Sequence, residues 1–266
     1  GPSSNIEQIQ ESVHHDGRRR AESSIIGDSC NTYFPLPNDF AAYMAGLGKQ
    51  HRNNCNRKLA QLQKTWPVGF DVVSDAAGVQ TEFESFQRLH TEQWKREGKL
   101  GHFGDWPHAL EFNREMVRTL GVQGKVRFHR ILAGGQVVCS QFCYVNGSTN
   151  YWRLPARAVG EEWLRYSFGY MGLIKMFEAS IAEGHSMVEG GRGHYDYKLH
   201  IGGREWPLRT VQFMPSCGCV RSRILLFRAA ARILTIGYYK IVFARIAPRV
   251  SMLRKPLWPF WIRRDW

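Results

Sequence analysis

The sequence lacks the paired Cys-x-x-Cys knuckles that a zinc ribbon needs, although it contains six cysteines. Cys139 and Cys143 would share one face of a strand and are typical of core positions. Cys217 and Cys219 lie in PSCGCV, which fits either a metal or redox site or a tight turn of small residues. We favour the tight turn. We therefore predict no metal site, and reduced thiols favour a cytoplasmic protein.

Long uncharged apolar runs are missing as well. Charged residues interrupt the apolar tail 220–247 at short intervals, so none of its runs approaches the ~20 residues that cross a bilayer. No signal peptide is visible, and the initial Gly1-Pro2 is typical of a cleaved purification tag, so we expect the natural start to lie upstream. We expect a cytoplasmic location. Peripheral attachment to the inner face of the membrane is compatible with this expectation.

Acidic residues are scarce: 23 Asp and Glu stand against 36 Lys and Arg, and the formal net charge is +13. A basic surface favours anionic partners such as phosphate-bearing cofactors, nucleic acid, anionic lipid or anionic glycans. Arg221, Arg228 and Arg232 fall on one face of the expected tail helix, which favours contact with an anionic membrane surface. Packing of this helix on the domain explains them equally well.

The clearest pattern in the chain is a central group of three antiparallel strands. Gly134-Gly135 and Asn146-Gly147 supply the positive φ of tight hairpin turns between them. Helical periodicity precedes this group, and a loop, a helix and a short strand follow it. The fold class is therefore α+β, an α/β/α sandwich in which helices flank a mixed, mainly antiparallel sheet, with a basic helical tail. The expected strands are 70–73, 126–132, 136–145, 148–154, 186–188 and 205–214, and the expected helices include 39–64, 76–95, 108–120 and 220–247.

Four segments between residues 38 and 200 carry a family resemblance: HRNNCNRKLAQLQK, LHTEQWKREGK, RYSFGYMGLIKMFEASIAEG and VEGGRGHYDYK. In this order they resemble the GNAT acyltransferases, in which a β-meander leads to a phosphate-binding loop, a helix and a strand splayed to admit acyl-CoA. They are similar above all to the branch typified by the CelD protein of bacterial cellulose biosynthesis, which is related to the FemAB peptidyltransferases. Glu189 stands where this branch usually has Asp, and Phe168 where it has Pro.

The resemblance divides the chain into three parts. Residues 1–34, with the basic run Arg18-Arg19-Arg20, are expected to be a flexible or truncated segment, with Ser24–Ile26 as an alternative edge strand. Residues 35–215 are the expected GNAT-like acyltransferase domain, and 216–266 a basic amphipathic helical tail. The end of this tail, PLWPFWIRRDW, mixes Trp and Arg and suits an interfacial anchor or an oligomer contact.

The co-substrate that the resemblance implies is acetyl-CoA or another acyl-CoA. Its pyrophosphate would bind at a helix N-terminus, where backbone N–H groups and a partial positive charge are available. The candidate cofactor-binding residues are Arg165, Ser167, Gly169 and Gly172. In the alternative interpretation Ser167 is only an N-cap and the glycines are packing residues.

Acyl transfer needs a polarised thioester carbonyl, a deprotonated acceptor and a proton for the leaving thiolate. Glu189 is the first candidate for general base or acceptor anchor, and Asp196 is the second candidate carboxylate. Tyr197 would protonate the thiolate, as a tyrosine often does in the GNAT fold. Lys198 would bind an anionic acceptor or hold Glu189. Alternatively, Glu189 is a structural carboxylate bonded to Arg192 or Lys198.

Candidate substrate-binding residues lie before the central strands and in the Gly-rich turn GGRG, residues 190–193. His90 and Trp94 are four apart on one helix face and would border the acceptor pocket, although a core role explains Trp94 as well. Arg57 would bind the acceptor or a phosphate, and a solvated basic helix face is its plainer explanation. Arg192 completes the set. The implied acceptor carries an amine or hydroxyl, as in a glycan or cell-envelope precursor.

Three functions compete at this point. The first is an acyl-CoA-dependent N- or O-acyltransferase of a bacterial type that works through a ternary complex. The second is a FemAB-like transferase that uses aminoacyl-tRNA; we favour it less because the long helical hairpin of those enzymes is not evident. The third is a non-catalytic GNAT-shaped module that binds anionic membrane or nucleic acid.

Overall fold

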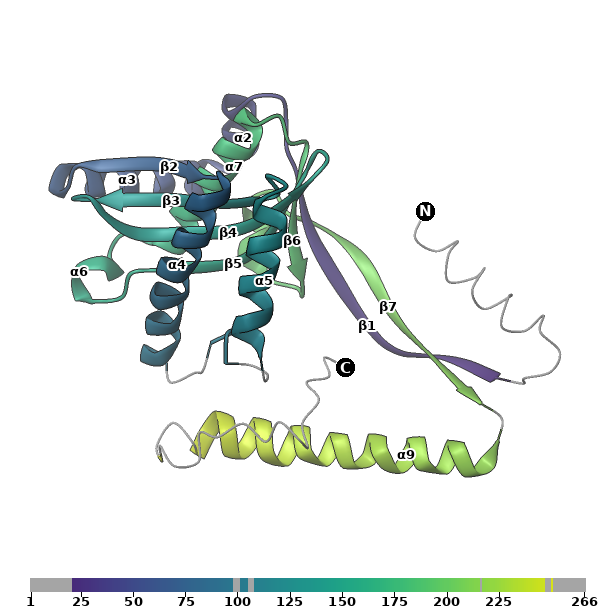
Figure 1. Ribbon diagram of the computed structural model, residues 1–266. Coiled ribbons are helices and arrows are strands. Elements are labelled where there is room, and N and C mark those ends of the chain that lie inside the picture. The colour runs from purple at the N-terminus through teal and green to yellow at the C-terminus, as the bar shows by residue number, and fades with distance from the viewer. Residues whose placement is uncertain (1–20, 98–100, 105–107, 216, 247–249, 251–266) are drawn as a thin grey trace. The chain divides into compact units, whose positions relative to one another are not determined.

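The computed structural model describes residues 21–97, 101–104, 108–215, 217–246 and 250 (Figure 1). Residues 30–206 form one compact unit, and the described residues on either side of it belong to a second. The basic run Arg18-Arg19-Arg20 and the segment PLWPFWIRRDW lie outside the described residues. The division at residues 34/35 and 215/216 stays a prediction.

Seven strands form one sheet in the order β2-β3-β4-β5-β6-β1-β7. The pairs β2–β3, β3–β4, β4–β5 and β1–β6 are antiparallel, and only β5–β6 among the strand pairs described is parallel. The mixed, mainly antiparallel sheet confirms the predicted fold class. The strands are β1 Ala21–Pro35, β2 Val68–Val73, β3 Val126–Ala133, β4 Gln136–Asn146, β5 Thr149–Arg157, β6 Met187–Arg192 and β7 Arg204–Pro215.

Helices pack on both faces of the sheet. Phe83 and Phe86 of α4 pack on Phe128 and Phe142 of the sheet in one apolar cluster. A second cluster joins the opposite face to α7 through aliphatic and aromatic side chains, among them Phe177. The helices are α2 Phe40–Gly46, α3 Lys49–Thr65, α4 Ala76–Arg96, α5 Ala109–Gly121, α6 Glu161–Leu164, α7 Phe168–Ala182, α8 Asp196–His200, α9 Gly218–Ile233 and η1 Leu234–Ile246.

Three local predictions differ from the structure. The helix expected over 39–64 is two helices, because buried Leu47 adopts an extended backbone and Gly48 starts α3 anew. The Gly-rich turn of the sequence is followed by an unpredicted short helix, α8. In the tail, the helix expected over 220–247 changes from α to π at Leu234. Among the helices of the described residues, none is long and apolar enough to span a membrane.

His129 of β3 is buried where the sheet meets α7, and its neighbour Asn150 bonds Ser180 of that helix. Burial lowers the pKa of His129 to about 4 from its usual 6.5. The unfolded chain therefore takes up this proton at a higher pH than the folded chain does. We expect the free energy of unfolding to fall by about 3 kcal/mol between pH 6.5 and pH 4 on this account.

Urea denaturation over this pH range measures the effect, with His129→Gln as the comparison because its amide can still bond Asn150. The variant should lack this part of the pH dependence. A difference between the two proteins that stays constant from pH 6.5 to pH 4 would contradict the assignment.

Candidate active site

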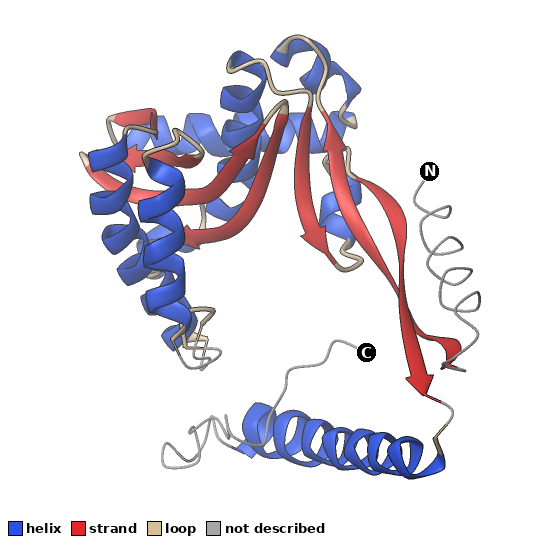
Figure 2. Ribbon diagram, turned by 45° about the vertical axis from the view of Figure 1, so that its right-hand side comes forward, coloured by secondary structure: helices blue, strands red, loops and turns tan. Residues whose placement is uncertain are grey.

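The parallel pairing of β5 with β6 is short. Thr149–Tyr151 pair with Met187–Glu189, and beyond these residues the two strands diverge (Figure 2). Further along β5, α4 contacts the strand at Pro155, whose carbonyl oxygen lies 2.8 Å from Nδ1 of His90. The edge of β5 that pairs with neither β6 nor α4 is therefore limited to Trp152–Leu154.

A β-bulge lies in this same free stretch. On β4, Phe142 and Cys143 are consecutive, whereas their partners on β5, Leu154 and Trp152, are separated by Arg153. Arg153 is therefore the extra residue, and its side chain is exposed. Bulges bend a strand and re-aim side chains, and they are over-represented beside active sites. The sheet is opened and distorted at one point.

The N-terminus of α7 lies at the end of the connection from β5. Ser167 precedes the helix in a left-handed conformation, with φ 57° and ψ 46°, and its carbonyl accepts from the N–H groups of Tyr170 and Met171. Its side chain is exposed and makes no capping hydrogen bond. The first N–H groups of α7 have no acceptor within the helix. Together with the helix dipole, they stabilise a negatively charged group that binds at this end.

Gly169 and Gly172, both candidate cofactor-binding residues, have different surroundings. A Cβ at Gly169 would meet no heavy atom within 4 Å, so this position faces open space in the first turn of α7. A Cβ at Gly172 would lie 2.5 Å from Sγ of Cys139 and would also meet Gln141 on β4. Gly172 therefore has the environment of a packing residue.

We expect Gly172→Ala to lower the free energy of unfolding by about 1–3 kcal/mol, because the methyl group would push α7 off β4. Gly169→Ala should instead leave stability unchanged or raise it, because alanine is the better helix residue. Thermal denaturation of both variants checks this. Equal stabilities would show that α7 has room to shift at Gly172.

Basic side chains gather near the start of α7. Lys58 of α3 donates a hydrogen bond to the carbonyl of Arg165, and the guanidinium of Arg165 lies 4.9 Å from the Tyr166 ring centroid. Arg165 is exposed. Arg57, next to Lys58, is also exposed and bonds Asn54 at 3.0 Å. Two cations, Lys58 and Arg165, thus flank the helix terminus.

Glu189 is the last residue of β6 that pairs with β5. Its Oε1 accepts from Nδ2 of Asn31 on β1 at 2.5 Å and from the N–H of Gly191 at 3.1 Å. Val188 packs in the cluster on the α7 face, so Glu189, the next residue of the strand, points to the other face. The carboxylate is held in place and half-buried.

Lys198 of α8 is 3% exposed. Its Nζ donates to the carbonyl of Gly190 at 2.8 Å and lies 4.7 Å from the ring centroid of Tyr195 and 5.9 Å from that of Trp152. Burial lowers the pKa of Lys198 from its usual range, and the Glu189 carboxylate opposes the shift. Lys198 therefore ties α8 to the end of β6 next to Glu189.

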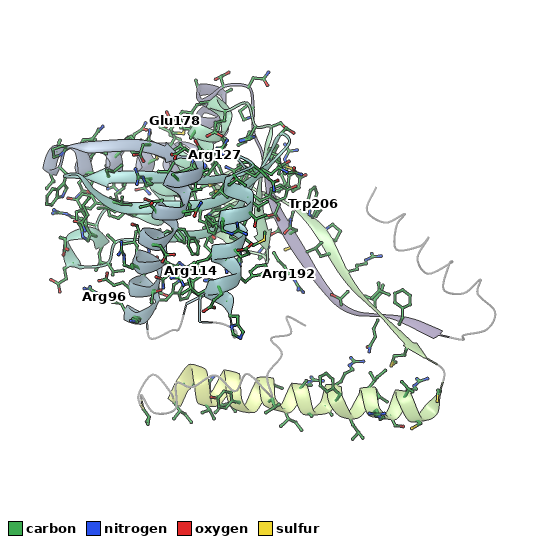
Figure 3. All side chains as sticks on the ribbon, in the orientation of Figure 1. Arg96, Arg114, Arg127, Glu178, Arg192 and Trp206 are labelled. Atoms are coloured by element: carbon green, nitrogen blue, oxygen red, sulfur yellow. The ribbon has the colours of Figure 1, made fainter. Side chains whose placement is uncertain are left out.

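The other predicted site residues are further out. Tyr197 is 46% exposed, and its pKa is raised by burial and by Tyr195. The Asp196 side chain is 82% exposed and lies 3.3 Å from Nε2 of His194. Arg192 is exposed at the end of β6 (Figure 3).

His90 lies inside the helix layer, and Trp94 is partly buried beside it. His90 is fully buried, and its Nε2 lies 3.2 Å from Nδ1 of His102 while its Nδ1 supports Pro155. Trp94 packs against His102 with ring centroids 5.2 Å apart. The contacts of His90 make it a support for β5, and an acceptor role for either residue stays a prediction.

Sequence reasoning missed three residues of this site: Asn31, Trp152 and Arg153. Asn31 falls in a segment interpreted as a tail, although the aromatic and β-branched run Thr32-Tyr33-Phe34 was a strand signal. Arg153 looks like any strand residue, because a bulge depends on the register between two strands.

Comparison with known proteins bears on the family and the fold. A family model described as an acetyltransferase (GNAT) domain matches residues 49–199. Among solved structures, FemX aligns with a TM-score of 0.50 at 11% identity, over 73% of this chain and 63% of that one. L-PGS from Bacillus licheniformis aligns with a TM-score of 0.50 at 10% identity, over 83% of this chain and 69% of that one.

A conserved protein of unknown function from Bacteroides thetaiotaomicron aligns with a TM-score of 0.50 at 12% identity, over 80% of this chain and 66% of that one. No curated protein matches the sequence. The chain spans less than two thirds of FemX, and at such low identity these alignments show a shared fold. Because the family model covers more than half of the chain, the chain belongs to the acetyltransferase (GNAT) domain family of acyltransferases.

Proposed function

We propose that the protein transfers an acyl group from acyl-CoA to an amine or hydroxyl. One observation carries this proposal: the pairing of β5 with β6 ends at Tyr151 and Glu189, immediately before the bulge at Arg153. An extended donor arm can add to a strand edge through main-chain hydrogen bonds. The pantetheine arm of CoA carries the amides that such an edge binds, and Trp152–Leu154 offers it.

The pyrophosphate of the donor would bind at the N-terminus of α7. The first-turn N–H groups, the exposed Ser167 hydroxyl and the cations Lys58 and Arg165 converge there. Open space at Gly169 leaves room for the phosphates. Gly172 contributes close packing of α7 on β4 rather than a ligand contact.

The acceptor would approach from the face opposite α7. Glu189 points to that face, and its two hydrogen bonds hold the carboxylate in place. It would take the proton from the attacking amine or hydroxyl as the acceptor reaches the thioester carbonyl at Trp152–Leu154. Arg192 at the exposed end of β6 would bind an anionic part of the acceptor.

The leaving thiolate needs a proton. Tyr197 is the candidate donor, because a tyrosine phenol carries its proton at neutral pH. Burial raises the pKa of Tyr197 further, so the transfer would need the thiolate to lie close to the phenol. Lys198 would act as a positioning residue that holds β6 through the carbonyl of Gly190. The exposure of Asp196 argues for a role outside the proton transfer.

The acceptor class is proposed from the fold relatives. FemX and L-PGS share the fold. By analogy with them, we propose a cell-envelope acceptor, which the protein would reach at the inner face of the membrane. Arginines of α9 alternate with exposed apolar side chains such as Leu226 and Ile233, which suits contact with anionic lipid. Because of the same likeness, aminoacyl-tRNA stays the alternative donor.

Titration of the purified protein with acetyl-CoA and with longer acyl-CoAs tests the proposal, together with release of free thiol in the presence of amine and hydroxyl acceptors. We expect micromolar binding and acceptor-dependent thiol release. Absence of binding by any acyl-CoA would overturn it. Affinity for anionic vesicles or RNA that falls steeply with salt, without turnover, would favour a non-catalytic module.

A further inference from the structure

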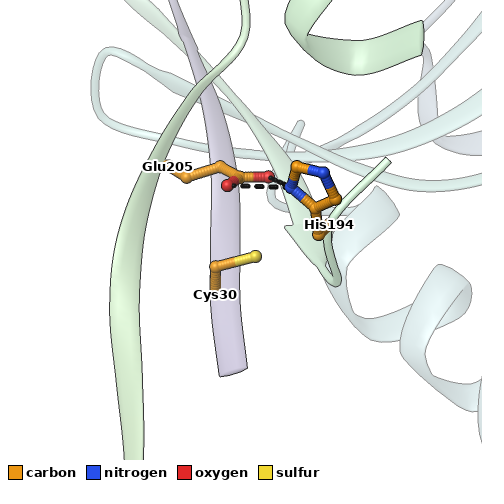
Figure 4. Close-up of side chains that lie close together, drawn as sticks. All are labelled: Cys30, His194 and Glu205. Atoms are coloured by element: carbon orange, nitrogen blue, oxygen red, sulfur yellow. Dashed lines mark hydrogen bonds and ion pairs between the residues drawn. The ribbon is translucent and has the colours of Figure 1, made fainter. Parts of the chain in front are cut away.

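A thiol, an imidazole and a carboxylate converge beside the candidate active site (Figure 4). Potential ligand atoms of Cys30, His194 and Glu205 all lie within 4.8 Å of one another. We propose that these three residues bind a zinc ion. The proposal does not rest on the proposed acyl transfer. Local sequence patterns could not predict the site, because Cys30 lies far before His194 and Glu205 in the chain.

The backbone around the three residues is fixed. The N–H of Gly193 donates to the carbonyl of Cys30 at 2.9 Å, and the hydroxyl of Thr32 donates back to the carbonyl of Gly193 at 3.2 Å. Gly193 has a φ of 106°, which favours glycine, so this turn places His194 over β1. The site is therefore preorganised on the β1 side.

Glu205 is held on the other side by its neighbour. Trp206, labelled in Figure 3, follows Glu205 in β7. Its ring stacks on that of Tyr33 of β1 with ring centroids 4.4 Å apart. This stacking keeps the start of β7 against β1, so the carboxylate faces Cys30 and His194. Three separate segments, β1, the turn before α8 and β7, thus contribute one donor atom each.

The donor set matches the preference of zinc for nitrogen and sulfur with a carboxylate. Nδ1 of His194 lies 2.9 and 3.2 Å from the two carboxylate oxygens of Glu205. Its other nitrogen, Nε2, lies 3.3 Å from Oδ1 of Asp196. A carboxylate on the second ring nitrogen fixes the tautomer of a metal-binding histidine, as in carboxylate–histidine–zinc triads.

Binding a small cation needs two local adjustments: ligand atoms that lie up to 4.8 Å apart must come closer, and those of His194 and Glu205 must separate. Zinc bonds of about 2.0–2.3 Å at tetrahedral angles separate ligand atoms by about 3.3–3.6 Å, so His194 and Glu205 must move apart by roughly half an ångström. The His194 side chain is 61% exposed and has room to do so. Cys30 would lose its proton on binding, and the cation would offset repulsion between thiolate and carboxylate.

Three protein ligands leave one tetrahedral position for water or a ligand. Asn31 follows Cys30 in β1 and donates to Glu189. A cation on Cys30 would therefore fix the strand that orients Glu189. It would also join β1 to β7, so that zinc binding to the folded chain raises its stability.

Zinc binding to the full chain tests the proposal. The protein is stripped with a chelator, dialysed, and titrated with Zn²⁺ in competition with a chromogenic chelator. We expect about one tight equivalent per chain, a raised Tm with zinc, and thiolate-to-metal charge-transfer absorption when Co²⁺ replaces zinc. Cys30→Ser should abolish the absorption and the tight binding, and Asp196→Asn should weaken binding about 10–100-fold.

The double variant Cys217→Ser/Cys219→Ser is the matched control, because these thiols are exposed and lie outside the cluster. It should bind zinc as the unchanged protein does. Loss of zinc in this control but not in Cys30→Ser would place the metal elsewhere and overturn the proposal. A chain that binds no tight zinc while retaining its native circular dichroism would show that the three side chains form only a hydrogen-bonded cluster.

Discussion

Gly169→Glu is expected to raise the Kd for acyl-CoA roughly 100-fold, or about 2.7 kcal/mol. The new carboxylate would occupy the open space at the first turn of α7 and take the N–H groups that the pyrophosphate needs. The fold should be retained, because nothing within 4 Å opposes the side chain and a negative charge in the first turn of a helix is favourable. Isothermal titration with acyl-CoA measures the effect, and the Tm reports the fold.

Gly218→Glu is the matched control. Gly218 is the first residue of α9 and also has no heavy atom within 4 Å of its Cβ position, so it receives the same charge in the same kind of environment. We expect its Kd for acyl-CoA to be unchanged. If both variants bind equally well, the pyrophosphate does not bind at α7.

The second large effect is expected at Glu189. Glu189→Gln keeps an oxygen that accepts from Asn31 and Gly191 but removes the negative charge that accepts a proton. We expect kcat to fall by about 10²–10³, with the Kd for acyl-CoA unchanged. Single-turnover kinetics with a fixed acyl-CoA measures the chemical step.

Glu178→Gln provides the comparison, since Glu178 is a partly exposed carboxylate that pairs with Lys175 on α7. It should turn over at the normal rate. A Glu189→Gln enzyme with normal turnover would remove Glu189 as the base, and the donor site at α7 would be unaffected by that result.

Local sequence signals predicted the centre of this fold well. Gly134, Gly135 and Gly147 adopt the positive φ that hairpin turns require, and β3, β4 and β5 lie within a few residues of their predicted bounds. Such signals depend on neighbours in sequence, and here the neighbours in sequence are also neighbours in the sheet. The helix start at Ser167 was predicted for the same reason.

The rest of the site depends on long-range pairing. Asn31 and Glu189 are 158 residues apart and meet only because β1 pairs with β6. The proposed zinc ligands meet because β1 lies between β6 and β7 in the sheet. Glu189 was predicted from a family likeness, but the partner that orients it could not be, since no local pattern records which strands become neighbours.

The short free edge of β5 has a consequence for the exchange of its amide hydrogens. Trp152–Leu154 lie between the last pair with β6 and the support from His90, so this stretch is flanked by protected backbone on both sides. Its outward-facing amides should exchange with solvent deuterium faster than those of β4, and an acyl-CoA that occupies the edge should slow them. The stretch of chain that opens the sheet would thus report, amide by amide, when the donor is bound.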